Sequence, residues 1–207
     1  MKSFAYAILA VIGLCLPATA WATLFDFDNA PYRSMLPISL TVEGIKADLS
    51  FTGDPKGFSI QRADALGFTP AGFSGLCIYP DSVFPADLHI AFTPALTDFS
   101  ILYAPEEYGS DASAIMRVTA YMRGALVGTN TAQADPPGTW PSATLGFSSA
   151  QPFDSVVVHW EKAPAGSENW GPIFMADNMN VTAAPEPSMV TMLALGTVAV
   201  LRHRRKA

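Results

Sequence analysis

Residues 38–51 read ISLTVEGIKADLSF, and this stretch decides the fold class. On each side of the central Glu43-Gly44 pair, apolar residues alternate with polar ones, so that Ile38 and Leu40 share one face. A period of two is typical of a half-buried β-strand, whereas an amphipathic helix has a period of 3.6. Two such runs joined by a short turn that contains glycine predict a β-hairpin.

The same pattern extends along the rest of the central chain. Residues 115–122 alternate in the same way and precede a turn at Gly124, and only residues 61–66 are considered as a helix. The other candidate strands are residues 58–60, 76–79, 88–92, 99–103, 144–147, 155–160 and 179–182. Short strands between clusters of Gly, Pro, Asp and Ser predict an all-β fold, an antiparallel β-sandwich. A jelly-roll arrangement is our first choice among sandwiches.

The part of the chain from Thr23 to Ala184 is long enough for one domain with a buried core. Of the 12 Lys and Arg residues, 7 remain in this part once Lys2 and the four basic residues of the C-terminal tail are left out, whereas it holds 17 of the 18 Asp and Glu residues. The resulting net charge of −10 offers no basic face for phosphate groups, so we exclude nucleic acid as a partner. Cys77 is the only cysteine in this part and is expected to be buried.

The first 22 residues have the features of a secretory signal peptide. Lys2 supplies a positive charge, residues 4–16 are largely apolar, and small residues with A-x-A spacing follow. We therefore expect export, with removal of this segment by signal peptidase after Ala20 or Ala22. A signal anchor that stays in the membrane is the alternative.

The last 23 residues combine three features. Pro185-Glu186-Pro187 interrupts any helix, because proline lacks the backbone N–H and restricts the residue before it. Residues 188–201 carry no charge, and a single hydrophobic helix of this length would span about 21 Å, less than the roughly 30 Å of a bilayer core. The basic tail that follows consists of Arg202, Arg204, Arg205 and Lys206. These cations favour retention of the C-terminal end in the cytoplasm.

Pro-Glu-Pro, a short apolar helix and a basic tail, in this order, resemble the PEP-CTERM sorting signal of Gram-negative bacteria. The resemblance implies recognition by an exosortase, an integral-membrane protease that would cut at or near Pro185-Glu186-Pro187. It also implies a precursor anchored transiently in the inner membrane, then a protein of the cell surface or extracellular space, associated with exopolysaccharide and biofilm. An ordinary single-span tail anchor is the alternative. The expected order is thus a signal peptide (1–22), a β-sandwich ectodomain (23–184) and the sorting signal (185–207).

One group of acidic residues has the chemistry of a metal site. Residues 24–29 alternate so that two phenylalanines are buried while Asp26 and Asp28 share the other face. If the first and last strands pair, these acids approach Asp177 and Asn178, and carboxylate and amide oxygens are ligands that calcium takes. The arrangement resembles the structural calcium site of jelly-roll carbohydrate-binding modules. The alternative is solvated acids and turn caps, because adjacent residues on a regular strand cannot both point inward.

Two tryptophans in loop sequences, Trp140 and Trp170, are candidate platforms for a sugar ring, or else caps on the end of the core. No catalytic residue is assigned. His89 and His159 occupy alternating positions in expected strands, and no set of three metal ligands can be assembled around them. Glycoside hydrolysis needs a pair of carboxylates, and the sequence does not indicate which two acids would form it.

The sequence therefore favours an exported, exosortase-processed surface or matrix protein that associates with extracellular polysaccharide through a lectin-like sandwich. A secreted carbohydrate-active hydrolase and a purely structural coat or adhesion subunit are the alternatives, since a fold alone does not determine function.

Overall fold

The computed structural model describes residues 21–53, 56–65, 67–106, 114–134, 141–162 and 173–185. The chain divides into two compact units, and one of them, Trp21–Ala184, contains every described strand. The other consists of Met1–Ala20 and Pro185–Ala207, and only Pro185 of this unit is described. The signal peptide up to Ala20, the expected hydrophobic helix and the basic tail therefore lie outside the described residues.

The described part of the chain contains ten strands and no helix, and every strand pair is antiparallel. The strands are β1 (Ala22–Phe25), β2 (Ile38–Val42), β3 (Ile45–Gly53), β4 (Phe58–Arg62), β5 (Leu76–Pro80), β6 (Ala86–Glu106), β7 (Ile115–Met122), β8 (Ala125–Gln133), β9 (Ala143–Lys162) and β10 (Ile173–Ala183). This confirms the all-β, antiparallel expectation. Accordingly, no helix within the described ranges is long and apolar enough to cross a membrane.

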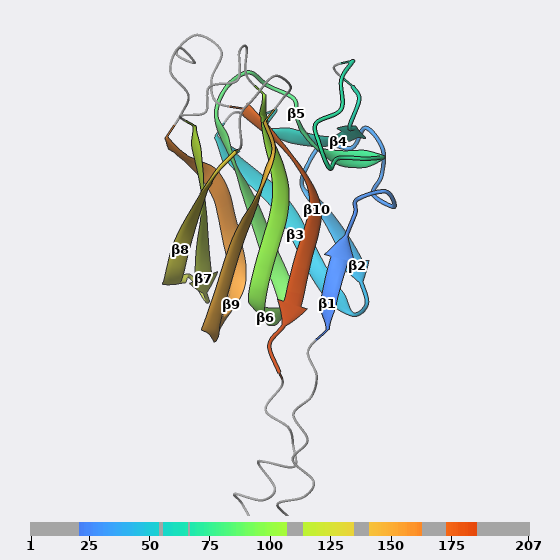
Figure 1. The fold of residues 1–207 in the computed structure, drawn as a ribbon. Helices are drawn as coiled ribbons and strands as arrows, with labels where there is room; N and C mark the ends of the chain where they lie inside the picture. The colour runs from blue at the N-terminus through green and yellow to red at the C-terminus, as the bar shows by residue number, and fades with distance from the viewer. Residues whose placement is uncertain are drawn as a thin grey trace, which may run out of the picture. The chain divides into compact units, whose positions relative to one another are not determined.

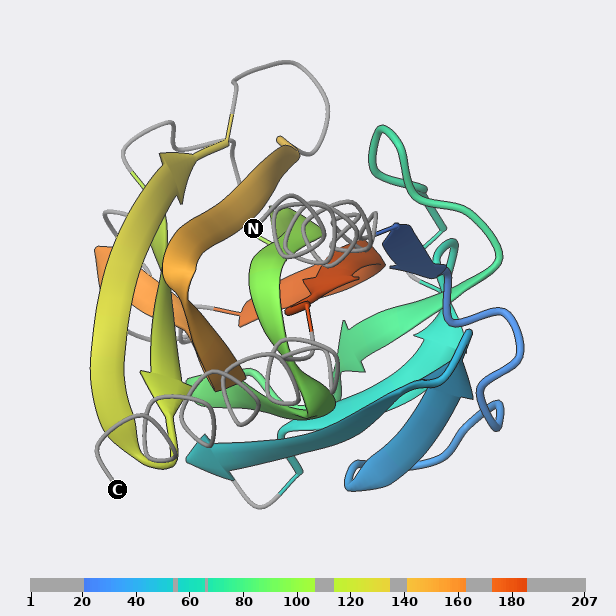
Figure 2. The same ribbon diagram turned by 90° about the horizontal axis from the view of Figure 1, so that it is seen from below.

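The two longest strands, β6 and β9, belong to two layers. Residues 86–93 of β6 pair with β3 and with the C-terminal half of β9, which in turn pairs with β7. Residues 96–106 of β6 pair with β10 and with the N-terminal half of β9. We name the layer with β2, β3, β7 and β8 sheet I, and the layer with β1, β4, β5 and β10 sheet II. Figure 1 shows β3 of sheet I behind β6 and β10, and Figure 2 shows the layers from below.

The hairpin predicted at residues 38–51 is present as β2 and β3. Its turn places both Glu43 (φ 49°) and Gly44 (φ 83°) in the left-handed region, as a two-residue turn between twisted antiparallel strands requires. Arg123 (φ 52°) and Gly124 (φ 80°) repeat this geometry between β7 and β8.

Several element boundaries differ from the sequence prediction. Residues 88–92 and 99–103 belong to one strand, β6, and the two runs predicted between 144 and 160 both belong to β9. Pro94 and Pro152 interrupt the alternation near the shifts in register, so each long strand has the sequence pattern of two short ones.

Two further predictions need correction. Residues 61 and 62 end β4 and residues 63–65 form a turn, so the helix considered at 61–66 is wrong. Strand β8 was not predicted, because its residues, ALVGTNTAQ, lie at the edge of sheet I and show no regular apolar alternation.

The main core lies between the sheets and is rich in aromatic residues. Phe25 and Phe27 are buried as the alternation at residues 24–29 predicts, and Phe174 packs against Phe58 with ring centroids 5.1 Å apart. Trp160 is partly buried and packs against this core, with its ring centroid 6.5 Å from that of Phe174.

A second, smaller core lies on the outer face of sheet II. Cys77 is fully buried there with Phe73 and Met175. Ala104 belongs to the same cluster, and it points away from the main core because its neighbour Tyr103 points into that core. The loop that carries Phe73 thus covers part of the outer face of sheet II.

Candidate functional site

The first and last strands of the domain pair, as the calcium hypothesis requires. β1 runs antiparallel to β10, with Phe25 opposite Met179. The chain turns away after Phe25, and the exposed Asp26 and Asp28 follow at once. Asp177 lies two residues before Met179, so the acids of both chain ends meet at one edge of sheet II.

A β-bulge in β10 lets the adjacent residues Asp177 and Asn178 both form hydrogen bonds with the loop at residues 72–76. Asn178 has a positive φ of 46°, and the ladder with β6 shifts register between Asp177 and Asn180. Asp177 is consequently 1% exposed, while the side chain of Asn178 donates a hydrogen bond of 3.0 Å to the carbonyl oxygen of Gly72. The β-bulge removes the objection that neighbours on a regular strand point to opposite faces.

The acids bind the backbone of the loop at residues 72–76. The amide of Ser74 donates to Oδ2 of Asp177 at 3.2 Å, and the amide of Leu76 donates to Oδ1 of Asp28 at 2.7 Å. Gly75 (φ 57°) lies so close that a β-carbon there would be 1.9 Å from Oδ1 of Asp28. Glycine is therefore required at this position by both its backbone angle and the lack of space.

The environment of Asp177 raises its pKa to about 6. Burial is the largest cause, because removal from water disfavours the charged form. Hydrogen bonds from the amides of Asn178 and Ser74 oppose the shift, whereas the nearby charges of Asp28 and Asp26 add to it. Because the charges of Asp28 and Asp26 raise the pKa of Asp177, the three acidic residues interact electrostatically and form one cluster.

The cluster has the donor chemistry for calcium, but several of its oxygens already accept hydrogen bonds. Both carboxylate oxygens of Asp177 accept backbone hydrogen bonds, and Oδ1 of Asp26 accepts one from the amide of Asp28. Among the described residues, no three His, Cys, Asp or Glu side chains are placed to hold a metal ion together. Asp28 and Asp177 thus anchor the 72–76 loop, and calcium binding remains a prediction.

The 72–76 loop also forms one wall of a pocket of about 490 Å³, which we name the Tyr32 pocket. A turn at residues 31–34 presents the tyrosine: Arg33 (φ 62°) donates its amide to the carbonyl oxygen of Ile60 on β4. Tyr32 remains 48% exposed, and the guanidinium of Arg33 lies over its ring, 5.1 Å from the centroid. Tyr32 is itself among the residues that line the pocket.

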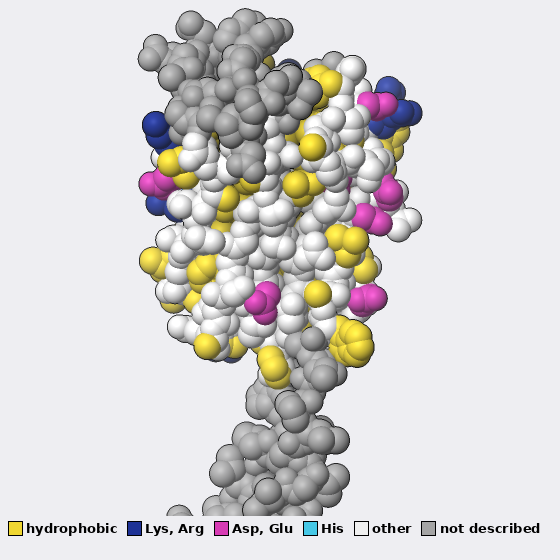
Figure 3. Space-filling model, viewed as in Figure 1, with side chains coloured by type: hydrophobic (Ala, Val, Ile, Leu, Met, Phe, Trp, Pro, Cys, Tyr) yellow, Lys and Arg dark blue, Asp and Glu magenta, His cyan; other side chains and the backbone are white. Residues whose placement is uncertain are grey.

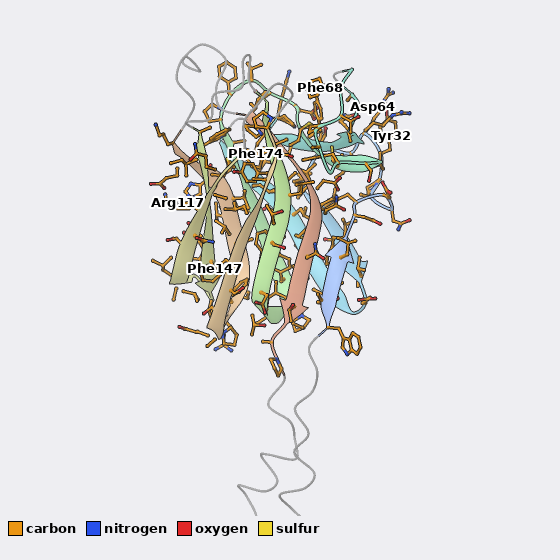
Figure 4. All side chains as sticks on the ribbon, in the orientation of Figure 1. Tyr32, Asp64, Phe68, Arg117, Phe147 and Phe174 are labelled. Carbon is orange, nitrogen blue, oxygen red and sulfur yellow. The ribbon has the colours of Figure 1, made fainter. Side chains whose placement is uncertain are left out.

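A charged pair also lines the Tyr32 pocket. Arg62 at the end of β4 donates to both carboxylate oxygens of Asp64, at 2.8 Å from Nε and 2.7 Å from Nη2. These hydrogen bonds lower the pKa of Asp64 and raise that of Arg62, so both stay charged. Figure 4 shows Tyr32 and Asp64 near each other at the edge of the domain beside β4. Thr69 and Ser74 add hydroxyl groups to the lining.

The pocket therefore combines a flat aromatic face with a fixed array of donors and acceptors. Binding sites for small polar ligands are built in this way, with apolar or aromatic surface for contact and a few placed polar groups for orientation. Tyr32, Arg62 and Asp64 were not predicted as site residues from the sequence. The available signal was the pair of opposite charges two residues apart, Arg62 and Asp64.

The other predicted residues have different outcomes. His89 and His159 lie on strands, as expected, and Nε2 of His159 accepts a hydrogen bond of 2.9 Å from Nε of Arg117. Burial is the main reason why the pKa of His159 is lowered. Trp140 and Trp170 lie outside the described residues.

Comparison with known proteins leaves the chain without an assigned family. No protein-family model and no curated protein matches it. Solved structures similar to it include the K1 cleaved adhesin domain of Lys-gingipain from Porphyromonas gingivalis W83, with 15% identity, coverage of 79% of this chain and 99% of that chain, and a TM-score of 0.43. A family 29 carbohydrate binding module has 10% identity, coverage of 80% and 90%, and a TM-score of 0.40.

The catalytic domain of Agl-KA is similar at 15% identity and a TM-score of 0.43, over 83% of this chain but only 30% of that chain. Likenesses of this strength carry no functional argument. The assignment of function therefore rests on the residues of this chain.

Proposed function

We propose that this protein is an exported β-sandwich, processed by an exosortase, that binds extracellular polysaccharide through the Tyr32 pocket. The observation that carries the binding proposal is the exposed ring of Tyr32 beside the paired Arg62 and Asp64. An aromatic ring presents a flat apolar face to the C–H groups of a sugar, while the charged pair offers donors and acceptors to its hydroxyl groups.

The electrostatics of the pocket favour a neutral or weakly charged ligand. Arg62 and Asp64 neutralise each other, so the pocket has no net charge from this pair to attract a phosphate or a polyanion. The domain as a whole is acidic, which disfavours strongly anionic chains at long range. Hydroxyl-rich chains need no charge complement, and the two ions with Thr69 and Ser74 satisfy their hydrogen bonds.

The sorting part of the proposal is supported by the sequence of the C-terminus and by where the domain ends. The amide of Ala184 donates to the carbonyl oxygen of Ala95 at 2.8 Å, and the exposed Pro185 follows immediately. The Pro-Glu-Pro motif thus begins directly after the last residue of the Trp21–Ala184 unit. An exosortase that cuts at the motif would release the domain with its β10 strand intact.

The binding proposal is tested with the purified ectodomain, residues 21–184, and an affinity gel that contains exopolysaccharide from the producing organism. We expect the wild-type domain to be retarded and the Arg62→Ala/Asp64→Ala double variant to be retarded clearly less. The matched control is Lys46→Ala/Asp48→Ala, which removes the exposed ion pair of the same spacing on β3. Equal retardation of wild type and of both double variants would contradict the role of the pocket.

A secreted hydrolase is the second candidate function. The purified ectodomain and the same exopolysaccharide distinguish it from binding. Glycoside hydrolysis normally needs two carboxyl groups about 5 to 9.5 Å apart on either side of the scissile bond. Asp64 is the one carboxylate among the described residues that line the Tyr32 pocket, and it is held by Arg62. Release of reducing sugar by the wild-type domain would favour the hydrolase, and its absence together with retardation favours binding.

A further inference from the structure

A second hollow, of about 560 Å³, lies on the outer face of sheet II, and we name it the sheet II groove. Strands β6, β8, β9 and β10 contribute its lining, together with the first residue of β1. Its polar lining residues are Asp98, Ser100, Asn130, Ser148, Asn180 and Thr182. Among the described residues, none lines both this groove and the Tyr32 pocket.

The strand register brings these polar residues into rows across the sheet. Ser100 on β6 is opposite Asn180 on β10, and Asp98 is opposite both Thr182 on β10 and Ser148 on β9. Directly opposed residues of antiparallel strands project to the same face, with β-carbons about 4.5 to 5.5 Å apart. The floor of the groove is therefore a regular array of hydroxyl, amide and carboxylate groups.

Asn130, on β8 of sheet I, also lines the groove, and its side chain is held in place. Nδ2 of Asn130 on β8 donates a hydrogen bond of 2.7 Å to the carbonyl oxygen of Gly146 on β9. This contact orients the Asn130 amide, so that its carbonyl oxygen and remaining N–H stay available to a ligand. Close to it, Gly128 allows β8 to approach the ring of Phe147.

The charge of the groove restricts the class of ligand. Oδ2 of Asp98 accepts a hydrogen bond of 2.8 Å from the hydroxyl of Thr97, and none of the ion pairs between described residues includes Asp98. A carboxylate without a cationic partner repels anionic chains and accepts hydrogen bonds from hydroxyl groups. In Figure 3 most of this face consists of backbone and of side chains that are neither hydrophobic nor charged, and the Lys and Arg side chains in view lie at its margins.

We propose that the sheet II groove is a second binding site, for a segment of a neutral polysaccharide chain. The proposal rests on the proposed function of the Tyr32 pocket, because one domain then holds two chain segments at separate places. A domain with two sites links chains to one another, and linkage increases the apparent affinity for a polymer well above that of either site. The protein is accordingly a cross-linker of an extracellular matrix.

The test uses the ectodomain and exopolysaccharide fragments separated by anion exchange into neutral and acidic fractions. The groove variant is Asp98→Asn/Asn180→Ala, and its matched control is Thr129→Ala/Thr131→Ala, on exposed positions of β8. Titration calorimetry measures the stoichiometry with neutral fragments, and the ¹H–¹⁵N spectrum reports the side-chain amides of Asn130 and Asn180. Turbidity with the intact polymer reports cross-linking.

We expect two neutral fragments per wild-type domain and one in the groove variant, with loss of turbidity but continued binding to the Tyr32 pocket. The amide signals of Asn130 and Asn180 should shift with neutral fragments and stay unchanged with acidic ones. A stoichiometry of one with unshifted amides would overturn the groove while leaving the Tyr32 pocket in place. Absence of all binding would instead contradict the proposed function, and a response to the acidic fraction alone would overturn the assignment to neutral chains.

Discussion

Asp177 on the last strand accepts a hydrogen bond from the amide of Ser74, 103 positions earlier in the chain. Through this bond the edge of sheet II holds the loop that forms one wall of the Tyr32 pocket. Asp28, just after the first strand, holds the same loop through the amide of Leu76. The two ends of the domain thus converge to hold one wall of the Tyr32 pocket.

Stability should depend on pH through Asp177. Its pKa is about 6 in the folded protein, above the ordinary value of 3.8, so the folded chain binds more protons than the unfolded chain between these values. The free energy of unfolding should therefore fall as pH rises from about 4 to about 6, by about 1 to 2 kcal/mol after allowance for solvent screening. Thermal unfolding from pH 4 to 7.5 measures this slope.

The variant Asp177→Asn should flatten this pH dependence, because the titrating group is gone. Asp81→Asn serves as the control and should retain the slope of the wild type. Asp81 is partly buried, and no hydrogen bond to its carboxylate is found among the described residues. A slope in Asp177→Asn equal to that of the wild type would show that another group titrates.

Calcium should raise the melting temperature of the ectodomain, and EDTA should lower it, if the acid cluster binds the ion as the sequence predicts. Binding would relieve the repulsion among Asp26, Asp28 and Asp177, so the effect should be larger at pH 7.5 than at pH 5. Melting temperatures unchanged by both reagents would mean that these acids serve the loop alone.

Gly75→Ala should destabilise the domain by more than about 2 kcal/mol. The new β-carbon would lie 1.9 Å from Oδ1 of Asp28, and the backbone of residue 75 has a positive φ that alanine adopts at a cost. Gly124→Ala is the control, since its φ is 80° and its surroundings are open, and it should cost about 1 kcal/mol from the backbone angle. Urea unfolding measures both. The difference should shrink when Asp28→Ala is added, and a difference that persists unchanged would place the clash elsewhere.

Processing should depend on the C-terminal motif. Full-length chain with Glu186→Ala, or with Arg202, Arg204 and Arg205 changed to Ala, should accumulate as unprocessed precursor in the membrane fraction. Immunoblots of membrane and extracellular fractions measure this, with Glu161→Ala on β9 as a control for loss of an acid within the domain. Normal processing of both altered chains would contradict the PEP-CTERM assignment.

Local alternation predicted the strands in which the pattern is regular. Residues 38–51 and 115–122 form β2, β3 and β7, because each of these strands has a clear inward face. The full lengths of β6 and β9 were missed where proline and register shifts break the pattern.

The candidate site shows the same limit. The meeting of Asp26 and Asp28 with Asp177 followed from the assumption that the terminal strands pair, which the β1–β10 ladder confirms. The Tyr32 pocket could not be predicted, because a turn, a strand end and a distant loop form it, and no local spacing records their approach. The sheet II groove likewise depends on a register that only the folded chain defines.

The most direct test of the binding account is the dissociation constant of the ectodomain for neutral exopolysaccharide fragments, measured by titration calorimetry for variants at Tyr32. Tyr32→Phe keeps the flat ring, and Phe84→Ala removes another exposed ring, 60% accessible against 48% for Tyr32, that is not among the described residues that line the pocket. The account predicts that Tyr32→Ala weakens binding at the pocket by roughly tenfold or more, whereas Tyr32→Phe and Phe84→Ala remain within a factor of about three of the wild type. An unchanged dissociation constant in Tyr32→Ala would contradict it.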